Sequence, residues 1–106
     1  MDESHERALK DFVEKATSAY GRRIKSIILF GSVARGTDRP DSDIDLLVVI
    51  DQEDFQLRRD LIGMTFDILL DTGQDISVKV ISVEDFLVHQ KFSFIQEVLS
   101  EGIKIA

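Results

Sequence analysis

Cysteine is absent from this sequence of 106 residues, and histidine occurs only twice. The absence of cysteine excludes disulfide bonds and metal sites built from thiolates. His5 and His89 lie far apart in the chain without the spacing of paired metal ligands, so a zinc site is not expected. We expect both histidines on the surfaces of helices.

Positive charge is also scarce, because 13 lysines and arginines face 20 aspartates and glutamates, for a formal net charge of -7. This balance excludes a broad electrostatic surface for DNA or RNA, which depends on clustered basic side chains. Carboxylates can still meet phosphate groups through a divalent cation. An acidic protein that handles nucleotides is therefore expected to use Mg²⁺, which prefers oxygen ligands.

Long apolar runs are missing as well, and no segment approaches the ~20 residues that a membrane-spanning helix needs. Residues 1–7 are polar and acidic, unlike the basic and then apolar start of a secretory signal. We therefore expect a cytoplasmic protein without a membrane span. The length leaves room for one hydrophobic core, so residues 1–106 are predicted to form a single domain.

The apolar residues that are present predict helices and strands in alternation. Spacing of three and four residues predicts amphipathic helices at about residues 4–20 and 54–70, and further helical segments from Ser82 to Leu99. Short aliphatic runs and period-two alternation predict strands at residues 24–30, 44–50 and 76–80, with a weaker edge strand at 103–105. This order predicts an α/β (α+β) fold with helices flanking a small sheet, and it leaves the strand directions open.

A turn after the first predicted strand has the composition of a phosphate-binding loop. Gly31 and Gly36 carry no side chain where the backbone must bend or approach a ligand closely. Ser32 offers a hydroxyl beside free backbone N–H groups, and Arg35 offers a planar guanidinium for phosphate oxygens. These four residues are the predicted nucleotide-binding set.

The two glycines have the separation found in a P-loop, but Thr37 stands where the lysine of that motif belongs. The P-loop interpretation is therefore excluded.

Two aspartates open the second predicted strand. Asp43 and Asp45 are two residues apart on an extended segment, so both carboxylates project from the same face while Ile44 points into the core. Their Cα atoms are expected roughly 6.6 Å apart at a rise of ~3.3 Å per residue. Paired catalytic metal ions commonly lie about 3.5 to 4 Å apart, so both carboxylates could hold such ions.

Asp75 is the candidate for a third carboxylate, because it stands at the start of the third predicted strand. There it could bind a metal ion and accept the proton of an attacking hydroxyl. In the alternation of that strand Asp75 shares a face with Ser77 and Lys79, so a shift of one residue in register would turn it away.

Taken together, the pattern from Gly31-Ser32 through Arg35-Gly36 to Ser42-Asp43-Ile44-Asp45-Leu46 resembles the signature of the minimal nucleotidyltransferases in the DNA polymerase β superfamily. The last residues, 95–105, also resemble the way many such chains end. The resemblance implies a nucleotidyltransferase fold with a small mixed sheet and two Mg²⁺ ions. It also implies that Asp43, Asp45 and Asp75 are the metal-binding and catalytic carboxylates, and that Gly31 and Ser32 hold the triphosphate.

In that family, many members are encoded beside a small helical partner called HEPN, and some act as antitoxins by adenylylating it. The resemblance thus implies transfer of AMP from ATP to an acceptor hydroxyl, with such a partner protein as one candidate acceptor. Two alternatives stay open: a module of the same fold that binds nucleotide or partner without turnover, and an antitoxin that acts by occlusion alone. The acceptor, the base preference and any homo-oligomer are not specified by these residues.

Overall fold

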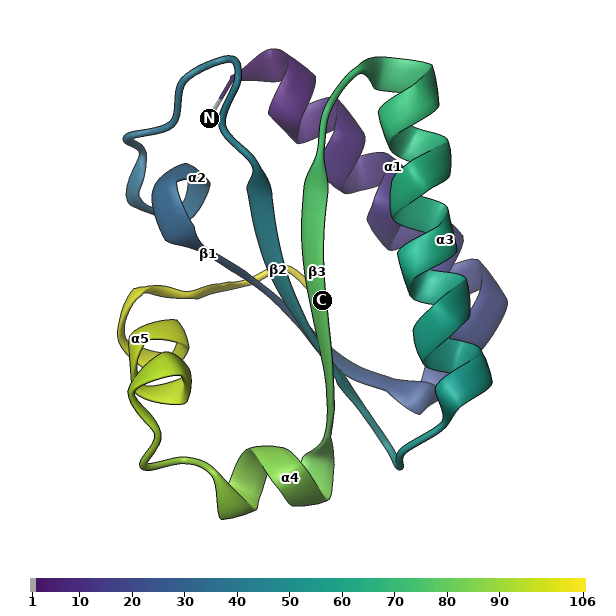
Figure 1. The fold of residues 1–106 in the computed structure, drawn as a ribbon, viewed down its shortest axis with the longest axis vertical. Coiled ribbons are helices and arrows are strands. Elements are labelled where there is room, and N and C mark those ends of the chain that lie inside the picture. Colours follow the sequence, from purple (N-terminus) through teal and green to yellow (C-terminus); the bar gives the residue numbers. More distant parts are fainter. Residues whose placement is uncertain (1) are drawn as a thin grey trace.

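The computed structural model describes residues 2–106, which form a four-stranded sheet between two layers of helices (Figure 1). The helices are α1 (Glu3–Tyr20), α2 (Gly31–Arg35), α3 (Phe55–Thr72), α4 (Val83–Val88) and α5 (Ser93–Glu101), with a short 3₁₀ turn, η1 (Gly21–Arg23). The strands are β1 (Ile24–Phe30), β2 (Ile44–Ile50), β3 (Ile76–Ser82) and β4 (Ile103–Lys104). The predicted α/β class with flanking helices is confirmed.

The strand order is β3-β2-β1-β4, and the sheet is mixed. Strand β1 pairs antiparallel with β2 and β4, whereas β2 and β3 run parallel. Helix α3 is the crossover that a parallel connection requires. The end of β1 and the starts of β2 and β3 therefore meet at one edge of the sheet.

Alternation along β2 divides its side chains between two cores. Ile44, Leu46, Val48 and Ile50 join the larger core under α1 and α3, where residues such as Phe12 and Leu61 are fully buried. Leu47 and Val49 join a smaller core with Phe30 and with Ile95 and Val98 of α5. The buried run 44–50 is thus a central strand covered on both faces, as its composition predicts.

Side chains at the helix ends explain where two of the longer elements begin. The Asp2 carboxylate accepts a hydrogen bond from the Ser4 N–H at the start of α1, and the Asp54 carboxylate accepts from Gln56 and Leu57 at the start of α3. The Ser82 hydroxyl accepts from the Asp85 N–H and so caps the start of α4. None of the helices within residues 2–106 has both the length and the apolar character needed to span a bilayer.

Candidate active site

The turn between β1 and α2 and the first residues of β2 form one unit. The antiparallel register places Phe30, the last residue of β1, opposite Asp45. Gly31 follows with φ +76°, a left-handed conformation that favours glycine. A Cβ atom on Gly31 would collide with Oδ2 of Asp45 and lie 3.1 Å from its Cγ. The missing side chain of Gly31 therefore lets the backbone turn lie directly against the Asp45 carboxylate.

The electrostatics of Asp45 favour a bound cation. Burial raises the pKa of the half-buried Asp45 carboxyl above its ordinary value, and the neighbouring Asp43 carboxylate raises it further. Lys79 and Arg35 act in the opposite direction. Asp43, just before β2, is exposed, and Ile44 between them is fully buried in the larger core. Two carboxylates on one side of the strand, of which Asp43 disfavours the charged form of Asp45, fit a hard divalent cation with oxygen ligands.

Helix α2 is a single turn that shapes the predicted phosphate-binding loop. Gly36 ends it with φ 75°, and the Gly36 N–H bonds to the Val33 carbonyl oxygen at 3.2 Å. The Thr37 N–H then bonds to the Ser32 carbonyl oxygen at 3.0 Å. The first N–H groups of such a turn have no partner within the helix and point toward its N-terminal side, the side of Gly31 and Asp45. Of the sequence-predicted residues, Gly31 therefore lies directly against Asp45, Ser32 follows it in the first turn of α2, and Gly36 ends that helix.

Arg35 points toward α5. Its Nη1 lies 3.1 Å from Oε2 of Glu101 and 4.0 Å from Oε1 of Glu97, and all three side chains are substantially exposed. Arg35 still acts electrostatically on Asp45. In this conformation the Arg35 guanidinium links α2 to α5. To contact a phosphate group, it would have to give up its ion pair with Glu101.

Asp75 occupies a different position from the first two aspartates. It precedes β3, its side chain is exposed, and its carbonyl oxygen accepts a hydrogen bond from the Ile44 N–H at 2.9 Å. Extending the parallel pairing of Ile44 with Ile76 by one residue places Asp75 beside Asp43. Within residues 2–106, no three His, Cys, Asp or Glu side chains are grouped so that they could hold one metal ion. Asp43 and Asp45 therefore lie at the start of one strand with Asp75 beside Asp43 at the start of the next, and a metal-binding role for Asp75 stays a prediction.

The expectation that His5 lies on a helix surface is wrong. His5 is fully buried, and its Nδ1 donates a hydrogen bond of 2.7 Å to Oδ2 of Asp38 in the loop before β2. Asp38 is therefore a partner of α1 instead of a solvated turn residue, and this bond holds its pKa below the ordinary value. The physical reason is that the loop folds back over the start of α1, which local periodicity cannot reveal. His89 lies near the end of α4, where its ring packs beside Phe92.

Lys79 is the residue at this site that the sequence analysis did not assign. It lies on β3 and shares a face with Ser77, which pairs in register with Asp45. Its charge acts on Asp45, and its Nζ lies 5.7 Å from the centre of the Phe94 ring. The available signal was the alternation that groups Lys79 with Asp75 and Ser77.

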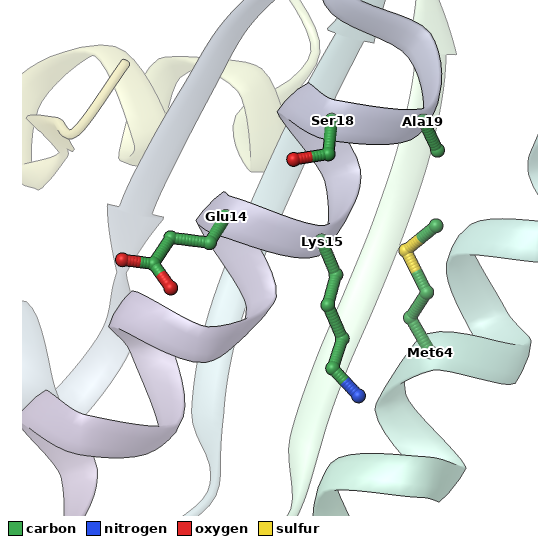
Figure 2. Close-up of a pocket in the computed structure, with 5 residues that line it drawn as sticks. All are labelled: Glu14, Lys15, Ser18, Ala19 and Met64. Atoms are coloured by element: carbon green, nitrogen blue, oxygen red, sulfur yellow. The ribbon is translucent and has the colours of Figure 1, made fainter.

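A separate hollow lies between α1 and α3, on the other side of the sheet from Asp45. Figure 2 shows the residues that line it, which are Glu14, Lys15, Ser18 and Ala19 of α1 and Met64 of α3. The hollow has a volume of about 540 Å³. It brings together none of the predicted site residues. Gly31 and Asp45 lie instead at the edge of the sheet where α2 begins.

Comparisons with known proteins agree with this arrangement. The model of the nucleotidyltransferase domain family matches residues 6–105. A Methanocaldococcus jannaschii protein, provisionally named a protein adenylyltransferase, is 43% identical over 99 residues, which cover 93% of this chain and 95% of the relative.

Two solved structures share the fold. A chain from Sulfolobus solfataricus, provisionally described as a nucleotidyltransferase, has a TM-score of 0.61 and 22% identity, covering 96% of this chain and 82% of its own. A chain in the complex of a tri-AMPylated HEPN toxin with MNT antitoxin, from Shewanella oneidensis, has a TM-score of 0.53 and 19% identity. The match covers 97% of this chain and 71% of that chain. At these identities the likeness establishes the fold alone. Because the family model spans nearly the whole chain and the M. jannaschii relative is similar over the same length, the resemblance inferred from the signature is confirmed, and the chain belongs to the nucleotidyltransferase domain family as a nucleotidyltransferase.

Proposed function

We propose that this chain transfers AMP from Mg²⁺-bound ATP to a hydroxyl group on a partner protein. The observation that supports this proposal is the half-buried Asp45 carboxylate, held next to Asp43 and directly against the Gly31 turn. The name of the M. jannaschii relative supports an adenylyl group and a protein acceptor.

In this proposal Asp43 and Asp45 hold the metal ion and the α2 turn holds the triphosphate. Mg²⁺ bound there would neutralise charge on the phosphates and lower the pKa of the attacking hydroxyl. Gly31 allows the phosphates to approach the backbone, and Ser32 adds a hydroxyl donor. Arg35 supplies positive charge after leaving Glu101.

The transfer itself is an in-line displacement at the α-phosphorus. The acceptor oxygen forms a bond to the α-phosphorus, the bond from that phosphorus to the oxygen bridging to the β-phosphate breaks, and pyrophosphate leaves. The hydroxyl proton passes to a carboxylate at this edge of the sheet. Asp75, exposed and beside Asp43, is the candidate base, a role that does not require it to bind metal.

The acceptor that we propose is a HEPN-type protein, with this chain as its antitoxin. The support comes from the fold shared with the MNT antitoxin of S. oneidensis, whose HEPN toxin carries AMP groups. Mass spectrometry of a coexpressed HEPN-type neighbour should find added AMP. If the preparation transfers AMP but the coexpressed neighbour carries none, the HEPN-type protein is not the acceptor.

The decisive experiment replaces Asp43 and Asp45 by Asn and follows label from α-³²P-ATP into the acceptor. We expect transfer to be abolished, because the metal ligands are lost. Asp41→Asn is the matched control, since Asp41 is an exposed aspartate in the same loop. Undiminished transfer by the double variant would refute the assignment.

The role of Asp75 is tested separately. Asp75→Asn should lower kcat by about 10² or more if Asp75 is the base, while Mn²⁺ binding measured by electron paramagnetic resonance stays unchanged. Weakened Mn²⁺ binding would instead identify Asp75 as a metal ligand.

A module that binds nucleotide without turnover is the second candidate, and one observation favours it. No third carboxylate joins Asp43 and Asp45 as a metal ligand within residues 2–106. This candidate predicts Mg²⁺-dependent ATP binding with no transfer to any acceptor, so binding and transfer should be measured on the same preparation.

A further inference from the structure

The face of the sheet that carries Asp45 continues onto β3 with a basic residue instead of an acidic one. Strands β2 and β3 are parallel, with Asp45 paired to Ser77, so neighbouring residues in register project to the same side. Lys79 is two residues beyond Ser77 and lies on the same face. The β3 positions on this face nearest Asp45 are therefore a hydroxyl and an ammonium group.

Aromatic packing holds the Lys79 ammonium near the site. Its Nζ lies 5.7 Å from the centre of the Phe94 ring, close enough for a cation–π contact. Phe94 of α5 packs edge-on against Phe30, with ring centres 5.4 Å apart and an angle of 80°. Phe30 is the residue paired opposite Asp45 and immediately before Gly31. Lys79, Phe94, Phe30 and Asp45 thus form a continuous series on one face.

The two basic groups that act on Asp45 have different partners. Arg35 is paired with Glu101 at 3.1 Å, whereas the ion pairs found in residues 2–106 do not include Lys79. Lys79 is exposed. Its charge lowers the pKa of Asp45, whereas the charge of Asp43 raises it. Its ammonium is available to an anion that reaches the Asp45 carboxylate.

We propose that Lys79 is a fixed cation of this active site, whose ammonium binds the triphosphate beside Asp45 and replaces a second metal ion. The inference rests on the proposed function, because it requires the nucleotide to bind at Asp43 and Asp45. It follows from the charges at hand: two carboxylates suffice for one Mg²⁺, whose remaining ligands come from phosphate and water. A second metal ion at Asp45 would need another carboxylate at the β3 positions nearest to it, where Ser77 and Lys79 stand, because Asp75 lies beside Asp43.

The test counts bound metal without relying on catalysis. The probe is Mn²⁺ with α,β-methylene-ATP, whose carbon bridge prevents cleavage of the bond that the proposed transfer would break. Electron paramagnetic resonance titration of the full chain should find one Mn²⁺ per bound nucleotide in the wild type. Two ions per nucleotide in the wild type would overturn the inference.

Substitutions of Lys79 test its contact with the nucleotide. Lys79→Gln should weaken binding of the analogue by about tenfold or more, the loss expected for one charge-assisted hydrogen bond. Lys79→Arg should retain most of the affinity, and Lys79→Asp should allow a second Mn²⁺ to bind. Lys25→Gln is the matched control, because Lys25 is also an exposed lysine on a strand but lies at the opposite end of β1 from Gly31. Wild-type affinity in Lys79→Gln would overturn the inference.

Failure of the inference can be distinguished from failure of the proposed function. Asp45→Asn should eliminate Mn²⁺ binding if the proposed metal site is correct. If it does, but Lys79→Gln binds the analogue like the wild type, only the role of Lys79 is wrong. If Asp45→Asn binds Mn²⁺ and nucleotide like the wild type, the proposed function fails as well.

Discussion

Asp45 occupies the space that a side chain on Gly31 would need. A Cβ atom built on the glycine, whose φ is +76°, would collide with Oδ2 of Asp45 and lie 3.1 Å from its Cγ. The proposed phosphate-binding turn and the proposed metal-binding carboxylate are therefore one structural feature, although Asp45 comes 14 positions after Gly31 in the sequence. A change in the turn should be felt directly by the metal site.

Gly31→Ala should consequently disable metal binding as well as strain the turn. Gly73→Ala is the matched control, because Gly73 has the same φ of +76° and nothing within 4 Å of a Cβ. The control should lose about 1 kcal/mol of unfolding free energy from the left-handed backbone alone. Gly31→Ala should lose more and should bind Mn²⁺ at least about tenfold more weakly, a difference of ~1.4 kcal/mol.

Chemical denaturation and Mn²⁺ titration of both variants would measure the two effects. Equal Mn²⁺ affinity in Gly31→Ala and Gly73→Ala would show that Asp45 adjusts without loss of the site.

Asp45→Asn should stabilise the metal-free protein at neutral pH. The folded-state pKa of Asp45 is raised, so its favourable contribution is fully present below the ordinary aspartate pKa of about 3.9 and is lost as the pH rises through the raised value. The uncharged amide avoids that loss. We expect a higher Tm for the metal-free variant at pH 7, and the difference from wild type should shrink as the pH is lowered toward the ordinary aspartate pKa.

After addition of Mg²⁺ the wild type should have a higher Tm than Asp45→Asn, because only the wild type binds the ion through two carboxylates. A variant that is less stable than the metal-free wild type at pH 7 would contradict the unfavourable interaction between Asp43 and Asp45.

The fold was largely accessible from the sequence because its signals are local. The almost unbroken aliphatic run 44–50 predicts a strand covered on both faces, and every residue of this strand except Asp45 is buried. The spacing of Leu9, Phe12 and Ala16 predicts the buried face of α1. Strand directions depend on which segments pair across the sheet, so the mixed order β3-β2-β1-β4 could not be obtained from such patterns.

The candidate site was predictable where it depends on neighbours in the chain. Asp43 and Asp45 follow from alternation along a single strand. The relation of Asp75 and Lys79 to that pair depends on the register between β2 and β3, which the sequence does not specify. The burial of His5 likewise depends on a loop 33 residues away.

Asp38 should contribute to acid sensitivity through its bond to His5. Its folded-state pKa is lowered, first by the His5 hydrogen bond, so the stability it supplies is present above the ordinary pKa of about 3.9 and is lost as the pH falls through the lowered value. Asp38→Asn cannot titrate. The difference in unfolding free energy between wild type and Asp38→Asn should therefore decrease below about pH 4.

Denaturant unfolding at a series of pH values would measure this difference. Asp41→Asn is a suitable control, since Asp41 is an exposed residue of the same loop. A difference between wild type and Asp38→Asn that does not change with pH would show that the His5 bond does not favour the ionised carboxylate.

Glu101 should compete with nucleotide for Arg35. If the guanidinium binds phosphate, it must give up its 3.1 Å contact with Glu101, so Glu101→Gln should tighten binding of α,β-methylene-ATP. An exposed ion pair is worth up to about 1 kcal/mol, which limits the gain to about fivefold. Glu97→Gln should have a smaller effect, because its contact with Arg35 is 4.0 Å.

Arg35→Ala should weaken binding by about tenfold, and the double variant with Glu101→Gln should bind no better than Arg35→Ala. Calorimetric titration measures all four affinities, and unchanged binding in both single variants of the pair would identify Arg35 as a structural link between α2 and α5 that does not contact the nucleotide.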